Sequence, residues 1–142
     1  MTVRAILDSK GRQIISVSPN DKVSSVVQML SQRRIGAVLV MSHHHIDGIL
    51  SERDIVRVIG ERGASALDED VSAVMTRKVI GCKPADTVGA IMEKMTTGKF
   101  RHLPVIEDEK VVGLISIGDV VKFRLREFER EQEALREYIA TA

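Results

Sequence analysis

The chain has 142 residues, of which 44% are hydrophobic and 29% charged, a balance that supports a folded core and argues against disorder. Lys and Arg number 21 against 20 Asp and Glu, so the net charge of +1 provides no field that attracts nucleic acid or anionic lipid. Aromatic residues are only 3% and Trp is absent, which argues against a stacking surface for single strands. We therefore expect neither nucleic-acid nor membrane binding.

The sequence also bears on the cellular location of the protein. No apolar run approaches the roughly 20 residues that a membrane-spanning helix needs. The first residues, Met-Thr-Val-Arg-Ala, lack a signal-peptide pattern, and the single cysteine, Cys82, excludes an internal disulfide. We expect a cytoplasmic protein.

The sequence repeats itself. The segment V-S-P-N-D-K-V at 17–23 recurs as C-K-P-A-D-T-V at 82–88, with an offset of 65 residues. The same offset, without a gap, pairs Asp21 with Asp86, Val40 with Val105, Gly48 with Gly113, Ser51 with Ser116, and Asp54 with Asp119. Before the prolines the offset is 68, so the first copy carries three extra residues there. Pro, Gly and Asp matching in one register indicate an internal duplication.

Each copy predicts the same five elements in chain order, which are strand, helix, strand, strand and helix. In the first copy these are a strand at 14–17, a helix from 23, strands at 37–41 and 46–50, and a helix beginning at Ser51. In the second copy they are a strand at 79–82, a helix from 88, strands at 103–106 and 111–115, and a helix beginning at Ser116. Asp21 and Asp86 are the expected caps of the first helices, and Gly98 the expected left-handed stop of the second copy's helix.

A serine followed three residues later by an aspartate stands at each strand-to-helix junction. Ser51 and Asp54 form this pair in the first copy, and Ser116 and Asp119 in the second. Free N–H groups at a helix start suit a phosphate or hydroxyl, and an ionised carboxylate can accept both hydroxyls of a ribose diol. The alternative is a capping box that only stabilises the helix. Because both copies keep the pair in register, we favour ligand binding.

Basic residues precede the second copy's third element. Arg101 and His102 follow Lys99, and cations beside a diol-binding carboxylate suit a phosphate, although a solvated basic surface is the alternative. The run 43–45, His-His-His, aligns with a polar hairpin tip, and neighbouring residues in extended chain point to opposite faces, so we expect no metal site. No nucleophile elbow or Gly-rich oxyanion loop is present, and we expect no enzymatic activity.

The chain resembles a tandem pair of CBS domains, the repeat named after cystathionine β-synthase. The resemblance covers roughly residues 3–123, and it depends on V-x-P-x-D-x-V, on R-H-L-P-V at 101–105, and on G-h-h-S-x-x-D, which occurs twice. It implies an α+β fold with two β-α-β-β-α motifs, at 1–62 and 63–122, related by pseudo-twofold symmetry and packed sheet to sheet. A C-terminal helix at 123–142 follows the two motifs.

The resemblance implies a regulatory module that binds an adenosyl nucleotide in two clefts, each drawing on both repeats. AMP, ATP and NAD are the leading ligands, and ADP and S-adenosylmethionine remain open. The residues implied for one cleft are Ser16, Val17, Ile35, Gly36, Ala37, Arg101, His102, Leu114, Ser116 and Asp119. Those implied for the other are Ile49, Ser51, Asp54, Ile80, Cys82, Phe100 and Arg101. The alternative function is a structural or protein-interaction module with unoccupied clefts.

The end of the chain predicts a long helix with a heptad-like seam, stepping by four and three residues through Val121, Leu125, Phe128, Gln132, Leu135 and Ile139. The seam can pack on its own domain or on a second copy, and we favour a homodimer. The resemblance implies dimerisation as well, since CBS modules commonly pair into a disc. An unknown effector protein would sense the bound nucleotide through a change in module shape or dimer geometry.

Overall fold

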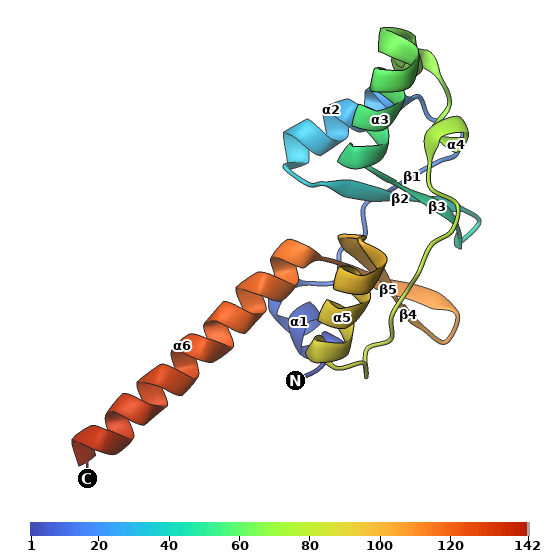
Figure 1. The fold of residues 1–142 in the computed structure, drawn as a ribbon. Coiled ribbons are helices and arrows are strands. Elements are labelled where there is room, and N and C mark those ends of the chain that lie inside the picture. Colours follow the sequence, from blue (N-terminus) through green and yellow to red (C-terminus); the bar gives the residue numbers. More distant parts are fainter. Residues whose placement is uncertain (142) are drawn as a thin grey trace. The chain divides into compact units, whose positions relative to one another are not determined.

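A computed structural model describes residues 1–141, which form two compact units (Figure 1). Unit 1 combines Met1–Arg12 with the chain from Gly81 onward, and unit 2 is Gln13–Ile80. Mixed helices and strands in two small sheets confirm the α+β class.

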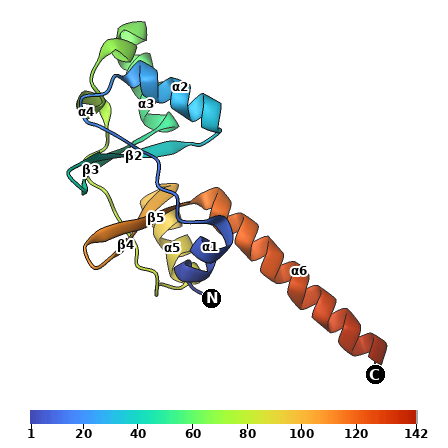
Figure 2. The same ribbon diagram turned by 180° about the vertical axis from the view of Figure 1, so that it is seen from behind.

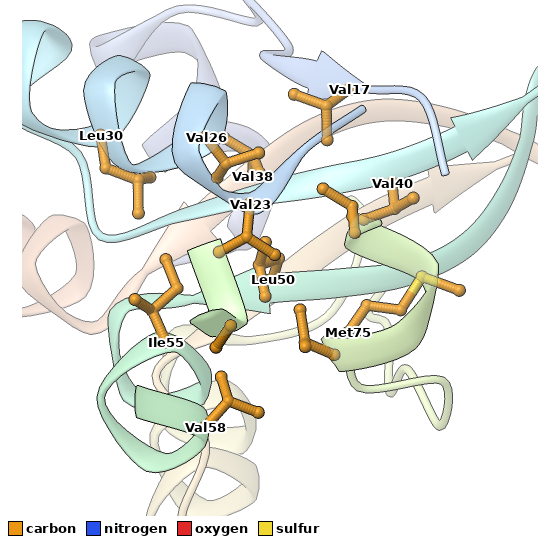
Figure 3. Packing of buried hydrophobic residues seen from close by; sticks show 13 residues of the cluster. Val17, Val23, Val26, Leu30, Val38, Val40, Leu50, Ile55, Val58 and Met75 are labelled. Carbon is orange, nitrogen blue, oxygen red and sulfur yellow. The ribbon is translucent and has the colours of Figure 1, made fainter. Parts of the chain in front are cut away.

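Unit 2 has a three-stranded sheet in the order β1-β2-β3. The short β1 (Ser16–Val17) pairs in parallel with β2 (Ala37–Ser42), which pairs antiparallel with β3 (His45–Ser51). Four helical segments complete the unit: α2 (Val23–Arg33), α3 (Glu52–Arg62), the 3-10 helix η1 (Gly63–Asp68) and α4 (Val71–Val74). The apolar side chains that α2, α3 and α4 direct at the sheet form the core in Figure 3.

Unit 1 has the same plan around a two-stranded antiparallel sheet of β4 (His102–Glu107) and β5 (Lys110–Ser116). Its helices are α1 (Val3–Lys10), α5 (Val88–Gly98) and α6 (Ile117–Thr141), and both views place α1 beside the start of α6 (Figures 1 and 2). Within its core, the side chains of α1 lie against those of α5 and the two strands.

The helix that opens each repeat, α1 in the first and α4 in the second, packs in the unit that holds the other repeat's strands. In unit 1, α1 is anchored because the N–H groups of Val3 and Arg4 donate to the carbonyls of Asp86 and Pro84. Unit 2 repeats the arrangement: the N–H groups that open α4, at Val71 and Ser72, donate to the carbonyls at Asp21 and Pro19. The folded units therefore do not coincide with contiguous halves of the sequence.

Two expectations about the starts of the helices are wrong. Asp21 does not cap α2, because its carboxylate accepts from the N–H of Ser18 and the cap position is Lys22. Asp86 likewise accepts from the N–H of Lys83, and the hydroxyl of Thr87 caps α5. Each aspartate closes the turn that contains the proline, one step before the helix starts.

The predicted strand at 79–82 is also wrong, since only Cys82 forms a bridge, to Val105. The prediction about Gly98 needs a correction too. Gly98 is the last residue of α5, and the left-handed residue is Lys99, with φ 57°. Glycine is required at 98 for space, because a Cβ there would lie 2.0 Å from a ring carbon of Phe100.

The predicted C-terminal helix is present and begins earlier than expected. It is continuous with the helix that starts after Ser116, giving 25 residues, while residue 142 lies outside the described residues. Among the described residues, no helix combines the length and apolar character needed to cross a membrane.

We predict that Gly98→Ala lowers the free energy of unfolding by about 1–3 kcal/mol, because the new methyl group displaces the Phe100 ring from the core of unit 1. Gly89→Ala in the same helix is the matched control. A Cβ at Gly89 meets nothing within 4 Å, so that change should be neutral or stabilising, by up to about 1 kcal/mol. Urea denaturation measures both, and equal effects of the two variants would contradict the steric explanation.

Candidate functional site

The strand-to-helix junction of unit 1 brings Ser116 and Asp119 together. The N–H of Ser116 donates to Oδ2 of Asp119 at 2.9 Å, and the N–H of Asp119 donates to the Ser116 hydroxyl at 3.1 Å. These reciprocal bonds are those of a capping box, so the capping role is real in this copy. The Asp119 side chain nevertheless keeps 23% of its surface exposed.

A third residue, which the sequence analysis missed, completes this group. Lys10, at the end of α1, places its Nζ 2.6 Å from Oδ2 of Asp119 and 2.7 Å from the carbonyl oxygen of Leu114. The two residues are 109 positions apart, and Lys10 lies outside every motif used above. Only the packing of α1 in unit 1 reveals the pair.

The surroundings of Asp119 keep it ionised. Burial by itself raises the pKa of a carboxyl group, but the hydrogen bond from Lys10 and the backbone bond from Ser116 lower it further than burial raises it. The pKa of Asp119 is therefore below its ordinary value. At neutral pH the junction presents a partly exposed carboxylate next to an ammonium group.

The matching aspartate of unit 2 is in a different state. Asp54 is 5% exposed, and four donors surround its carboxylate. Oδ2 accepts from the N–H and the hydroxyl of Ser51 at 3.0 and 3.1 Å, and Oδ1 accepts from Thr76 at 2.9 Å and Arg57 at 3.1 Å. With a full capping box as well, Asp54 is a structural carboxylate whose acceptor capacity is largely used.

The difference between the two aspartates comes from the C-terminal end of α1, where Lys10 lies, and from the residues just after α4, where Thr76 lies. After α4, Thr76 forms an antiparallel bridge with Ile49, which brings its hydroxyl to Asp54. At the end of α1, the side chain of Lys10 reaches the carbonyl of Leu114, the residue that corresponds to Ile49. The carboxylate of Asp54 is thus closed in by the Thr76 hydroxyl together with the guanidinium of Arg57, whereas the carboxylate of Asp119 has the ammonium group of Lys10 beside it.

Several of the other predicted residues gather at the same two junctions. In unit 1, His102 pairs with Ser116 across the strands, and the N–H of Ile117 donates to the carbonyl of Arg101. Arg101 is exposed, whereas His102 and Leu114 are partly buried. Phe100 packs against the core from its edge. The strand register therefore places the basic pair beside the Ser116–Asp119 group.

The predicted residues of unit 2 cluster in the corresponding way. Ala37 pairs with Ser51, and the N–H of Glu52 donates to the carbonyl of Gly36. Ala37 is buried, whereas Ile35, Gly36 and Ile49 are partly buried. This cluster lacks the basic side chains that Arg101 and His102 bring to unit 1.

Four predicted residues lie away from these junctions. Ser16 is exposed on β1, and Ile80 is 41% exposed. Val17 and Cys82 are buried, and each belongs to the apolar core of its own unit. Burial raises the pKa of the Cys82 thiol to about 11, with Asp86 adding to the effect, so the thiol is protonated at neutral pH and a poor nucleophile.

The histidine run forms a tight hairpin turn. His43 and His44 have φ of 49° and 67°, the backbone of a two-residue primed turn, and Asp108 and Glu109 repeat it with 52° and 65°. Within residues 1–141, no group of three His, Cys, Asp or Glu side chains is placed to hold a metal ion.

The fold and the paired junctions define a tandem-repeat module in which each copy has a helix, an antiparallel pair of strands and a second helix that starts at the Ser–Asp junction. The family model for the CBS domain matches the chain twice, at 3–61 and 71–126, and the chain belongs to this family. The mitochondrial CBS domain-containing protein CBSX3 of Arabidopsis thaliana is 33% identical over 97% of this chain and 71% of its own length. The crystal structure of the CBS-domain protein ATU1752 from Agrobacterium tumefaciens matches with a TM-score of 0.85, at 41% identity, over 87% of this chain and 99% of its own.

Two more distant structures share the fold and carry ligands. The CBS domain protein PAE2072 of Pyrobaculum aerophilum, in complex with AMP, matches with a TM-score of 0.74 and 24% identity over 84% of this chain and 89% of its own. The CBS domain pair of protein MJ0100, in complex with 5′-methylthioadenosine and S-adenosyl-L-methionine, matches with a TM-score of 0.79 and 21% identity over 89% of this chain and 98% of its own.

We predict that Thr76→Val lowers the free energy of unfolding by about 1–3 kcal/mol, because it removes one donor from the buried Asp54 carboxylate without changing the side chain's size. Thr97→Val, at an exposed position of α5, is the control and should change stability little. If chemical denaturation gave the two variants equal stability, the bond between Thr76 and Asp54 would contribute nothing.

We also predict a pH dependence for the pair of Lys10 and Asp119. Because the pKa of Asp119 is lowered in the folded protein, its contribution to stability is fully present above the ordinary pKa of Asp and is lost as the pH falls through the folded pKa. Lys10→Met should raise the pKa of Asp119, which a carboxyl NMR titration measures. Its stability deficit relative to the parent protein should shrink between neutral pH and about pH 2.

Lys78→Met, an exposed change in unit 2, is the control for that titration. It removes the same charge from a position away from the Asp119 carboxylate. A deficit for Lys10→Met that stayed constant with pH would show that Lys10 acts through packing rather than through Asp119.

Proposed function

We propose that this chain is a regulatory module that binds an adenosyl nucleotide, with Asp119 accepting hydrogen bonds from the ribose diol. One observation carries the proposal: of the two repeated aspartates, Asp119 alone combines an ionised carboxylate with a partly exposed side chain. Since the bonds from Ser116 and Lys10 fall on Oδ2, we assign the diol to Oδ1.

The ligands of the two distant relatives support an adenosine-centred site. AMP, methylthioadenosine and S-adenosylmethionine share adenine and a ribose with both hydroxyls, and only AMP carries a phosphate. A carboxylate that recognises the diol serves all three. In this chain Arg101 and His102, beside Ser116, are the groups we assign to a phosphate, which favours AMP, ADP, ATP or NAD over S-adenosylmethionine.

We propose unequal roles for the two junctions. Asp54 is closed in by Ser51, Thr76 and Arg57, so a diol would have to displace bonds that already satisfy it. The unit 2 junction is therefore the weaker or unoccupied one. The assignment of each site to residues of both repeats, including Ser16, Ile35 and Ile80, stays a prediction from the family resemblance.

Regulation would operate through the populations of two states of the module. A nucleotide shifts the balance between them only by its difference in affinity for the two. An effector protein would then sense the favoured state. The absence of enzymatic activity and the cytoplasmic location stay predictions.

A structural or interaction module is the second candidate, and a specific observation favours it. The Ser and Asp of both junctions form the reciprocal bonds of a capping box, which accounts for these residues without any ligand. This candidate predicts that Asp119 variants change stability and that nucleotides do not bind.

Calorimetric titration with AMP, ADP, ATP, NAD and S-adenosylmethionine tests the proposal. We expect at least one ligand to bind, and Asp119→Asn to weaken it by about tenfold to a hundredfold through loss of the charged acceptor. Asp108→Asn, in the exposed hairpin turn of the same unit, should bind as the parent does. A nucleotide-free preparation that binds none of the five would favour the structural module, and unchanged affinity in Asp119→Asn would overturn the ribose assignment.

A further inference from the structure

The C-terminal helix carries an apolar stripe that its own unit leaves uncovered. The stripe consists of residues spaced alternately four and three apart, and we call this set the α6 seam: Val121, Leu125, Phe128, Gln132, Leu135 and Ile139. Its five apolar members are 48–66% exposed. Scattered exposed apolar residues are ordinary, but five in one helical register form a continuous stripe.

This stripe is not the face by which α6 packs in unit 1. That face is marked by Val120, which is buried, and by Phe123 and Glu127, which are partly buried. At 100° per residue, the centres of the two faces are about 130° apart around the helix. The seam is therefore a second apolar face, separate from the one that anchors the helix.

The seam extends past the repeat itself. In the first copy the equivalent helix, α3, ends at Arg62, which corresponds to residue 127 at the offset of 65. The family match ends at residue 126, whereas α6 continues to Thr141. Every residue from 131 to 141 is exposed. A helical end without packing is marginal in water, so the apolar residues at 135 and 139 indicate a covering partner.

We propose that the α6 seam is a parallel, in-register contact with α6 of a second copy of this chain. The inference does not rest on nucleotide binding. The seam follows a heptad with Leu125, Gln132 and Ile139 at the a positions, and Val121, Phe128 and Leu135 at the d positions. The occupant and its direction follow from the charges beside the seam.

The flanking charges are complementary only when the two helices are parallel. In a parallel pair each g residue faces the e residue of the next heptad on the other helix. Arg124 then faces Glu129 of the second copy, and Glu131 faces Arg136 of the second copy. By symmetry each attraction occurs twice, so all four contacts join opposite charges.

An antiparallel pair would oppose like charges. Matching Leu125 with Leu135 of the second copy brings e residues against e residues and g against g. Glu129 then faces its own counterpart, as does Glu131, and Lys122 faces Arg136. Gln132 adds to the preference, since a polar a residue is most easily satisfied by the same residue across a parallel, in-register pair.

Cysteine cross-linking tests the orientation directly. In the parallel pair Ile139→Cys brings two thiols together at the seam, whereas an antiparallel pair would separate them by about 27 Å along the axis. Glu137→Cys, two residues away and on the opposite side of α6, is the matched control. Both positions are exposed, and the native Cys82 is buried in both variants. Circular dichroism verifies that each variant keeps its helix content.

We expect Ile139→Cys to form a disulfide-linked dimer at least about tenfold faster than Glu137→Cys under mild oxidation. Equal rates for the two variants, or no cross-linking by either, would overturn the proposal. Faster linking of Ile139→Cys to Val121→Cys in a mixture would also overturn it, because that product requires antiparallel helices.

A charge exchange gives a second, independent readout. Glu131→Arg should raise the dimer dissociation constant measured by sedimentation, and so should Arg136→Glu, because each leaves like charges facing each other. The double variant restores the complementary pair and should bind as the parent does. Additive losses in the double variant would contradict the parallel register.

Discussion

Each sheet depends on a helix from the other repeat to complete its core. The side chains of Val3, Ile6 and Leu7 in α1 are almost fully buried among the strands and helix of the second copy. Val71 and Val74 in α4 do the same for the first copy. A small two- or three-stranded sheet with a single helix layer buries too little apolar surface to be stable, so neither half of the sequence is a folding unit by itself. The contiguous stretch that forms a unit is 13–80.

The same exchange sets the chemistry of the two junctions. Both aspartates are held by the Ser–Asp bonds that the motif encodes, but a further partner comes from the end of the exchanged helix or from the residues just after it. Thr76 completes the hydrogen bonding of Asp54 and leaves it buried. Lys10 holds Asp119 as a partly exposed carboxylate of lowered pKa. Two junctions with the same motif therefore differ in what they can offer a ligand. The motif itself does not encode the difference, because Thr76 lies 22 residues from Asp54 and Lys10 lies 109 residues from Asp119.

Sequence reasoning predicted the elements whose signals are local. Apolar periodicity predicted α2 and α5, apolar segments joined by polar turns predicted β2 to β5, and the repeated Ser predicted where α3 and α6 begin. It failed where a signal had two physical explanations. Gly98 matches a left-handed stop, yet its lack of a Cβ serves the Phe100 ring. Asp21 matches a helix cap, yet it closes the preceding turn. Lys10 could not be predicted at all, because its partner is 109 residues away and no pattern links them.

The length of α6 joins the two proposals physically. Asp119 lies in the first turn of this helix, and Ile139 lies 20 residues further along, about 30 Å at 1.5 Å per residue. A continuous helix moves largely as one body, so a small tilt at the first turn becomes a larger displacement at the seam. A ligand that contacts Asp119 competes with or reinforces the bond to Lys10, which ties α6 to the end of α1. If a nucleotide favours one of those two arrangements, its binding energy biases the geometry of paired seams, and the coupling is reciprocal: a fixed pairing of the seams would alter nucleotide affinity by the same factor.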